Sequence, residues 1–310
     1  MSDWLLIDID GADVQFARCS SAMPTAFTGK RSYSSRAFAT ATDCLLRYAA
    51  DEDIALSGLT VAMVMSGPVT GDTVRIARCP WISIRGIGYL TRGDPVALND
   101  SVAKAWANFH HSSLSHRLVG GAATALPPGP ALETKRYVVI NFRVGVGAAI
   151  FSTGPDASFH VESEMGHMSF APENAVERAL AAVLERRHAP VGWEAALLCA
   201  AMDPTWRDTP LAGDTRAIGL ARAGMLGAFC GHAVLAGCTW GGALVHGNGR
   251  ELLASAEAMA AFNTRFEARA GQTTTMRSVP RWTVTIEQEN LVGAALYLKA
   301  RREVALPAAA

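Results

Sequence analysis

The sequence lacks the features that mark several classes of protein. Its 28 basic and 28 acidic residues leave no net charge, so attraction to nucleic acid or to an anionic membrane has little support. Apolar stretches such as residues 237–245 are much shorter than the roughly 20 residues of a membrane span. The first residues lack the positive region and apolar run of a signal peptide. We therefore expect a cytoplasmic protein that binds neither nucleic acid nor membrane.

The six cysteines also lack the spacing of a metal site or of a disulfide framework. None of them forms a Cys-x-x-Cys pair, which favours free thiols, most of them in the core. His110, His111 and His116 lie near one another, but no carboxylate or cysteine stands at metal-ligand spacing from them. We expect a solvated helix end there.

Apolar runs and helical patterns follow each other along the 310 residues and predict a mixed α/β protein large enough for two domains. Strand-turn-strand patterns near residues 4–17 and 137–151 suggest an internal duplication, with two turns facing a cleft that could hold a phosphorylated ligand. Strands are expected at residues 4–9, 59–65, 137–140 and 282–286, and helices at 36–50, 174–187, 216–237 and the C-terminal end.

Two short segments carry the clearest chemical signals. Asn99 and Asp100 can hydrogen-bond the hydroxyls of a polyol, and the carboxylate of Asp100 can accept a proton from a hydroxyl. Standing at the entry to a helix, the same pair can equally cap it. Residues 8–13 follow a buried strand and turn tightly, which is typical of a phosphate loop. Asp8 by itself is equally compatible with a role in capping that turn.

Several motifs, in order along nearly the whole chain, resemble those of the bacterial glucokinase family. The most specific is Glu164 to Pro172, which is similar to the family's Glu-Gly-Gly-His-x-x-Phe-Ala-Pro with Met165 in place of one glycine. The others are Pro68-Val69-Thr70-Gly71-Asp72, Leu98-Asn99-Asp100 and Arg265-Phe266-Glu267.

The resemblance implies a two-domain α/β fold of the hexokinase/actin-like (ribonuclease H-like) type, with mixed five-stranded sheets and an interdomain cleft. The small domain would take residues 1–108 and 297–310, and the large domain residues 109–296. It also implies a homodimer.

A hexose site follows from the same resemblance. Asp100 would be the catalytic base that takes the proton of the 6-hydroxyl. Asn99, Glu164, His167 and Glu194 would hydrogen-bond the other hydroxyls, since carboxylates, an amide and an imidazole match the donors and acceptors of a sugar ring. Glucose is the hexose that the family implies, although mannose or an amino sugar could use the same ligands.

The nucleotide motifs depart from the family pattern. The phosphate loop Asp-x-Gly-Gly-Thr reads Asp8-Ile9-Asp10-Gly11-Ala12, the loop Gly-Thr-Gly-x-Gly reads Arg143-Val144-Gly145-Val146-Gly147, and the paired glycines of the adenosine loop read Gly247-Asn248. By resemblance, ATP would be bound with Mg²⁺ held through water by Asp8. The residues that would contact the nucleotide are Asp8, Gly11, Gly145, Gly147 and Gly247.

The substitution at Asp10 has a calculable effect. A carboxylate about 4 Å from a phosphate charge costs about 4 kcal/mol at an effective dielectric constant near 20, which is roughly a thousandfold in affinity. A cross-cleft ion pair between Asp10 and Arg143 would cancel this repulsion, and we state that pair as a hypothesis.

Three functions remain open on the sequence alone. The first is an ATP- and Mg²⁺-dependent glucokinase with weakened nucleotide binding. The second is a catalytically silent, hexose-binding pseudokinase that acts as a sensor or regulator. The third is a kinase with another phosphoryl donor, of which the chain gives no positive sign. The base and the sugar ligands are all present, which favours the first.

Overall fold

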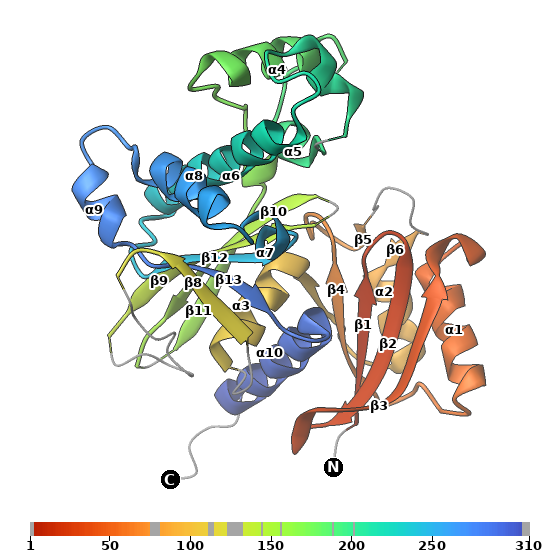
Figure 1. Ribbon diagram of the computed structural model, residues 1–310. Coiled ribbons are helices and arrows are strands. Elements are labelled where there is room, and N and C mark those ends of the chain that lie inside the picture. The colour runs from red at the N-terminus through yellow and green to blue at the C-terminus, as the bar shows by residue number, and fades with distance from the viewer. Residues whose placement is uncertain are drawn as a thin grey trace. The chain divides into compact units, whose positions relative to one another are not determined.

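The computed structural model describes residues 3–74, 81–110, 115–122, 133–143, 145–155, 157–187, 189–200 and 202–305 (Figure 1). The chain splits into two compact units. Unit 1 consists of Met1–Ser113 and Ile286–Ala310, and unit 2 of Leu114–Thr285. The boundary expected before residue 297 would divide α10 (Glu289–Ala305), which is one continuous helix. The domain bounds that the resemblance implies stay a prediction.

Unit 1 is built on a mixed five-stranded sheet in the order β3-β2-β1-β4-β7. β1 is buried from Trp4 to Ile9, as expected for a central strand with side chains packed on both faces. It pairs antiparallel with β2 and parallel with β4. The strands are β1 (Asp3–Ile9), β2 (Asp13–Ser20), β3 (Met23–Ser34), β4 (Thr60–Met65) and β7 (Val96–Asn99).

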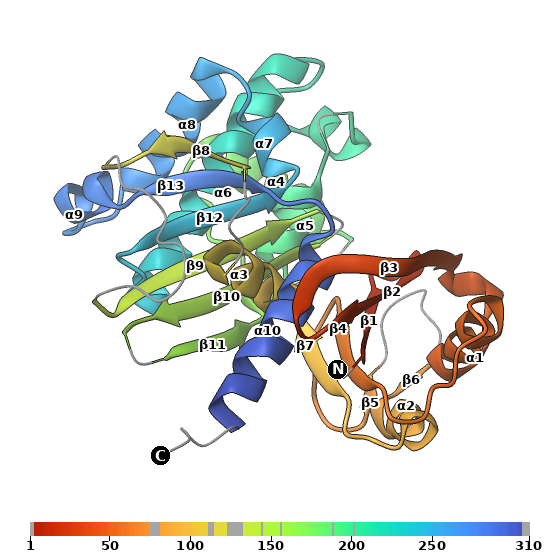
Figure 2. The same ribbon diagram turned by 90° about the horizontal axis from the view of Figure 1, so that it is seen from below.

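Helices α3 and α10 of unit 1 run side by side in both views (Figures 1 and 2). They approach closely because Gly293 has no side chain, and a Cβ there would collide with the carbonyl oxygen of Ala103. The remaining elements are η1 (Ser35–Ala37), α1 (Ala41–Asp51), α2 (Ile84–Thr91), α3 (Asp100–His110) and the short strands β5 (Thr73–Val74) and β6 (Ile82–Ser83).

Unit 2 is built on a six-stranded sheet in the order β11-β10-β9-β12-β13-β8, which Figure 2 shows strand by strand. Its first five strands repeat the order of unit 1, with an antiparallel hairpin followed by parallel strands, as the suggested duplication requires. The strands are β8 (Ser115–Gly120), β9 (Lys135–Phe142), β10 (Val146–Thr153), β11 (Ser158–Ser163), β12 (Gly242–Gly247) and β13 (Arg281–Thr285).

The expectation of two five-stranded sheets is wrong for unit 2, because β8 adds a sixth strand. β8 pairs antiparallel with β13 at the sheet edge, and only Val119 in it is buried. An edge strand with one buried apolar residue has almost no hydrophobic periodicity, so the sequence contains little signal for it.

Helices α6 and α8 pack together and cover one face of the unit 2 sheet (Figure 1). Their backbones meet at Gly227, where a Cβ would collide with the carbonyl oxygen of Phe262. The helical elements are η2 (Met165–His167), α4 (Ala175–Glu185), α5 (Trp193–Leu198), η3 (Pro204–Asp208), α6 (Thr215–Gly237), α7 (Gly249–Leu252), α8 (Ala256–Glu267) and α9 (Thr273–Ser278).

Among the described residues, α6 is the one helix with the length and apolarity of a membrane span. It is longer than the stretch at 237–245 that stood out in the sequence. Most of its apolar residues belong to the core of unit 2. A core helix of a soluble protein passes the same test, so α6 is weak evidence for a membrane protein.

The strands expected at residues 4–9, 59–65, 137–140 and 282–286 are confirmed as β1, β4, β9 and β13, and the helices as α1, α4, α6 and α10. The helix expected from residue 36 begins only at Ala41. Thr40 and Asp43 form a reciprocal capping box there, which satisfies two free amides and sets the start.

Two expectations about reactive side chains have different outcomes. The five cysteines in the described part of the chain are free, and four of them are buried, while Cys79 lies outside the described residues. The expectation of a solvated helix end is wrong in part for His110, the half-buried last residue of α3, which stacks on Trp106 at 4.7 Å between ring centroids. Burial lowers the pKa of His110 to about 4. His116 is exposed on β8, and His111 lies outside the described residues.

Candidate functional site

The expected base, Asp100, is the first residue of α3, directly after β7. Its side chain is 11% exposed, and its carboxylate accepts hydrogen bonds from two hydroxyls, Ser66 Oγ at 3.2 Å and Ser101 Oγ at 3.3 Å. Lys104 Nζ lies 3.9 Å from its Oδ2, one helical turn further on. A carboxylate with these three neighbours is held in one orientation.

The side chain of Asn99 performs the capping role that the sequence left open. Its Oδ1 accepts a hydrogen bond from the backbone N–H of Ser101 at 2.8 Å, and its Nδ2 donates to the carbonyl oxygen of Gly67 at 3.0 Å. The amide thus joins the start of α3 to the turn after β4. Among the described residues Nδ2 makes this one hydrogen bond, and an amide nitrogen has two hydrogens, so its second N–H could bind a ligand.

Asp8 lies near the end of β1 and is 8% exposed. Its Oδ1 accepts a hydrogen bond from Asn290 Nδ2 at 2.9 Å. Burial raises the pKa of Asp8 to about 7, although the ammonium of Lys104 and the hydrogen bond from Asn290 act in the opposite direction. Asp8 therefore holds a proton more readily than an ordinary aspartate, unless a cation binds beside it.

The turn between β1 and β2 is stabilised by hydrogen bonds among its own residues. Gly11 adopts φ 91°, which glycine allows and other residues disfavour. Asp10 Oδ1 accepts hydrogen bonds from the backbone N–H groups of Ala12 at 3.2 Å and Asp13 at 3.0 Å. Successive N–H groups of this kind are the donors with which a turn binds an anion. Here a carboxylate of the chain already occupies them.

In unit 2, Glu164 and His167 come together at η2. His167 Nε2 lies 3.7 Å from Glu164 Oε2, and both side chains are well exposed. The backbone of η2 passes so close to β10 that Gly166 is required, since a Cβ there would collide with the carbonyl oxygen of Val146. The specific motif of the sequence thus presents a carboxylate and an imidazole on a tightly packed turn.

Glu194, in the first turn of α5, is joined to the same region. Its Oε2 accepts a hydrogen bond from the backbone N–H of Val146 at 2.8 Å. The segment after η2 is bonded to the segment before α5, with Phe170 N donating to Val191 O at 2.8 Å and Trp193 N donating to Met168 O at 3.0 Å. These bonds bring Glu194 and η2 to the same end of β10.

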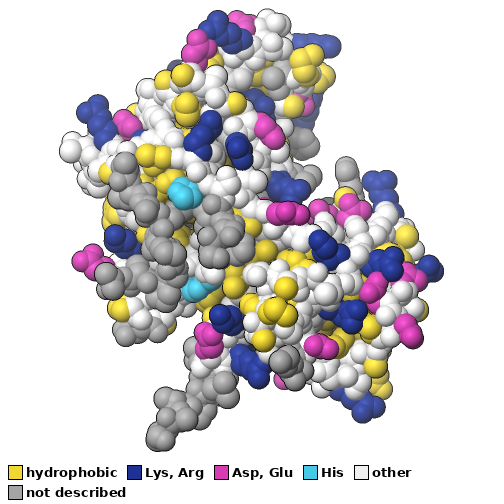
Figure 3. Space-filling model, turned by 60° about the horizontal axis from the view of Figure 1, so that its bottom comes forward, with side chains coloured by type: hydrophobic (Ala, Val, Ile, Leu, Met, Phe, Trp, Pro, Cys, Tyr) yellow, Lys and Arg dark blue, Asp and Glu magenta, His cyan; other side chains and the backbone are white. Residues whose placement is uncertain are grey.

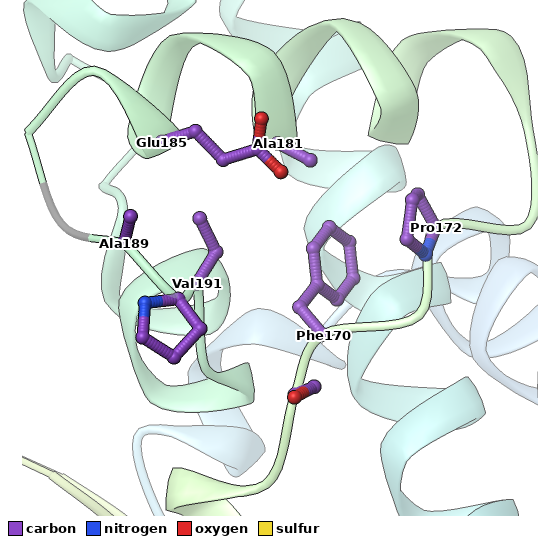
Figure 4. Close-up of a pocket in the computed structure, with 8 residues that line it drawn as sticks. Phe170, Pro172, Ala181, Glu185, Ala189 and Val191 are labelled. Atoms are coloured by element: carbon purple, nitrogen blue, oxygen red, sulfur yellow. The ribbon is translucent and has the colours of Figure 1, made fainter.

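A surface pocket of about 350 Å³ is lined by the segment that follows η2 and by the segment that precedes α5. Figure 4 shows Phe170 and Pro172 on one side of it, Val191 on the other, and the carboxylate of Glu185 directed into the space from α4. It contains none of the predicted site residues.

The other two expected nucleotide loops are adjacent in unit 2, because β9 and β12 pair in parallel and bring Gly247 beside Phe142. Asn248 donates from its backbone N–H to the carbonyl oxygen of Phe142 at 2.7 Å and from Nδ2 to that of Arg143 at 3.3 Å. Gly247 has φ 74° and packs against Arg143. Gly145 and Gly147 follow at the start of β10, whereas Val144 lies outside the described residues.

The hypothetical ion pair between Asp10 and Arg143 joins residues of different units and stays a prediction. Within the described residues, no group of three or more His, Cys, Asp or Glu side chains could hold a metal ion alone. Mg²⁺ in phosphoryl-transfer sites is usually bound by one or two carboxylates together with waters and phosphates. Asp8 alone fits that smaller requirement.

On the face shown in Figure 3, acidic and basic side chains are interspersed.

The motif at Arg265 to Glu267 proves to be structural. Arg265 pairs with Glu177 and Glu173, the latter at 2.9 Å, and Glu267 pairs with the buried Arg281 at 3.1 Å. These contacts connect α8 with α4 and β13.

Sequence reasoning missed Lys104, Glu289 and Asn290. The spacing of four residues from Asp100 to Lys104 is a recognisable ion-pair signal on a helix. No local signal indicates that residues 289 and 290 meet Lys104, since they lie more than 180 positions further along the chain.

Comparisons with known proteins identify the family of the chain. The family model described as Glucokinase matches residues 5–201 and 218–301. A glucokinase of Stenotrophomonas maltophilia (strain R551-3) is 26% identical over 319 residues, which cover 94% of each chain.

Solved structures show the same fold. A glucokinase from an Antarctic psychrotroph superimposes with a TM-score of 0.72 at 20% identity, covering 96% of this chain and 99% of that one. A Balamuthia mandrillaris glucokinase in complex with glucose superimposes with a TM-score of 0.74 at 12% identity, covering 97% and 94%. The α/β fold is thus the hexokinase/actin-like one, as predicted, and the chain belongs to the glucokinase family.

Proposed function

We propose that this protein transfers a phosphoryl group from ATP to the 6-hydroxyl of a hexose, in the first place glucose. Family membership supports a sugar kinase. The observation that carries the finer proposal is the setting of Asp100, a mostly buried carboxylate fixed at the start of α3 by two hydroxyls and an ammonium. A general base needs this kind of fixed position.

In the proposed reaction, the hexose 6-hydroxyl attacks the γ-phosphorus of ATP, its proton passes to Asp100, and ADP leaves. As the family resemblance implies, Asn99, Glu164, His167 and Glu194 would bind the remaining hydroxyls. Ser66 and Ser101 would keep the Asp100 carboxylate oriented through their hydrogen bonds. Mg²⁺, held through water by Asp8, would supply positive charge at the phosphates.

We further propose that ATP binds weakly. The backbone N–H groups of Ala12 and Asp13 donate to Asp10, so a phosphate would have to displace a carboxylate and tolerate its charge. At about 4 Å this repulsion is about 4 kcal/mol at an effective dielectric constant near 20, or roughly a thousandfold in affinity. Gly145, Gly147 and Gly247 would still offer close backbone approach to the nucleotide.

The same contact favours the second candidate, a hexose-binding pseudokinase that acts as a sensor or regulator. If the Asp10 carboxylate is never displaced, the sugar residues remain but phosphoryl transfer does not occur. For either function we propose a cytoplasmic protein, and a homodimer as the family resemblance implies.

Thermal stabilisation and a coupled assay separate the two candidates. We expect glucose alone to raise the Tm, MgATP to raise it only at millimolar concentration, and glucose 6-phosphate to form. Asp100→Ala should abolish turnover while glucose still raises the Tm. Stabilisation by glucose without any turnover at millimolar MgATP would reject the kinase and leave the pseudokinase.

A second pair of variants tests the nucleotide loops. Asp10→Gly together with Arg143→Gly should lower the KM for MgATP, because both side chains are removed from the loops that the family uses for phosphate. Asp13→Asn is the matched control, since it removes a neighbouring exposed carboxylate. In the described contacts, the two backbone N–H groups of the turn donate to the side chain of Asp10 and not to that of Asp13. An unchanged KM in the double variant would show that Asp10 and Arg143 do not obstruct ATP.

A further inference from the structure

The interior of unit 1 contains a lysine surrounded by the residues on which the proposed reaction depends. The side chain of Lys104 is 1% exposed. Its Nζ donates a hydrogen bond to Asn290 Oδ1 at 2.8 Å and lies 3.5 Å from Glu289 Oε1 and 3.9 Å from Asp100 Oδ2. An ammonium has three N–H donors, and these three oxygens are arranged around it.

A lysine is rarely buried to this extent, because removing the charge from water is costly unless partners replace the hydration. On its own face of α3, Lys104 has the buried polar residues Asp100, Ser101 and Asn108 one turn away, while the flanking residues Val102, Ala103, Ala105 and Trp106 are buried and apolar. A methionine or leucine would fill such a site without that cost. The charge of Lys104 therefore has to be explained by what its ammonium contacts.

The contacts form a continuous chain between the two aspartates. Lys104 reaches Asp100 directly, and it reaches Asp8 through Asn290, whose Oδ1 accepts from Lys104 while its Nδ2 donates to Asp8 Oδ1 at 2.9 Å. The amide of Asn290 thereby has a fixed orientation, because reversing it would place a donor against the ammonium and an acceptor against the carboxylate. The four residues linked by these contacts, Asp8, Asn290, Lys104 and Asp100, all belong to unit 1.

We propose that Lys104 is a positioning residue that holds the base Asp100 and, through Asn290, the carboxylate of Asp8 in a fixed arrangement for phosphoryl transfer. This inference rests on the proposed function. Lys104 is too deeply buried to touch the hexose or the nucleotide, so it acts through its two partners. Its ammonium also offsets the negative charges of the side chains around it, those of Asp8, Asp100 and Glu289.

Kinetics of three variants test the proposal. Lys104→Met keeps the length and volume of the side chain but removes its charge, and kcat should fall at least about tenfold, since small displacements of a catalytic group have effects of this size or larger. The KM for glucose should change little, because the sugar ligands are untouched. Asn290→Ala breaks only the branch to Asp8 and should lower kcat less. Lys299→Met, which removes a half-exposed lysine of α10, should leave kcat unchanged.

The double variant Lys104→Met with Asn290→Ala distinguishes a chain of contacts from two separate effects. If Lys104 acts partly through Asn290, the double variant should lose less activity than the product of the two single losses. A kcat in Lys104→Met within about twofold of wild type would overturn the proposal. So would a parallel loss of kcat and glucose affinity, which would indicate general damage to the fold.

A stability measurement keeps the inference testable if the protein has no kinase activity. Lys104→Met should lower the Tm, and at least half of that loss should be restored by adding Asp100→Asn, because the uncompensated carboxylate is then removed. An equal loss of Tm in both backgrounds would overturn the pairing of Lys104 with Asp100. Absence of turnover in the wild-type protein, by contrast, would refute only the proposed function.

Discussion

Replacing Asp8 with asparagine should stabilise the protein, and the gain should grow with pH. The asparagine side chain has the shape of the aspartate and would still accept the hydrogen bond from Asn290 through its amide oxygen, but it cannot ionise. The pKa of Asp8 rises from 3.8 to about 7 on folding because burial penalises the charged form. The wild-type protein is therefore subject to a penalty that the variant avoids.

The sign and size of the effect follow from proton linkage. The folded state binds the Asp8 proton more tightly than the unfolded state, so stability is unaffected by this group below about pH 4 and falls as the pH rises towards 7. Each pH unit between the two pKa values corresponds to about 1.4 kcal/mol. The stability advantage of Asp8→Asn should therefore grow by about 2–3 kcal/mol between pH 5 and pH 8.

Urea unfolding of both proteins at several pH values measures this difference. Metal-free buffer is needed, since a cation bound at Asp8 would favour its charged form. Asp94→Asn, at an exposed aspartate, is the matched control for removing a carboxylate. An Asp8→Asn advantage that stays the same from pH 5 to pH 8 would refute the argument that burial raises the pKa of Asp8.

Two further predictions concern packing and buried charge. Gly293→Ala should destabilise the protein by about 1–3 kcal/mol because its Cβ would collide with the backbone of α3. Gly219→Ala, in open space on α6, should instead stabilise the protein by about 0.5–1 kcal/mol through helix propensity. Urea unfolding measures both changes, and an equal effect at the two sites would contradict the close contact between α3 and α10. Arg265→Met should cost about 3–5 kcal/mol because it leaves Glu177, 3% exposed, as a buried charge without its main partner. Arg216→Met, at an exposed ion pair, should change stability little, and a similar loss in both arginine variants would refute the role of burial.

Much of the fold could be predicted from the sequence because its signals are local. The apolar run at β1 and the hairpin that follows it are encoded within 20 consecutive residues, and the same holds for β9 and β10. β8 was missed because it has only one buried apolar residue. The end of α3 was misjudged because the expectation took no account of the stacking of His110 on Trp106, four residues earlier on the same helix.

The candidate site was predictable only in part. The order of the motifs identified Asn99, Asp100 and the segment from Glu164 to His167 as the expected sugar ligands. That Glu194 anchors the start of β10 through Val146 depends on a contact between residues 48 positions apart. The hydrogen bonds of Asp10 with the two amides that follow it are local, and the Asp-x-x-Asp spacing of the turn is compatible with them.

By itself, the sequence determined the α/β class, the hairpin strands, the family and the alteration of the ATP motifs, because each of these depends on residue types at short spacing. The tertiary structure alone decided that Asp8 is buried with a raised pKa, and that Lys104 meets Glu289 and Asn290. The physical reason is that charge and burial depend on neighbours in space. For Lys104 those neighbours come from a helix 186 residues away along the chain.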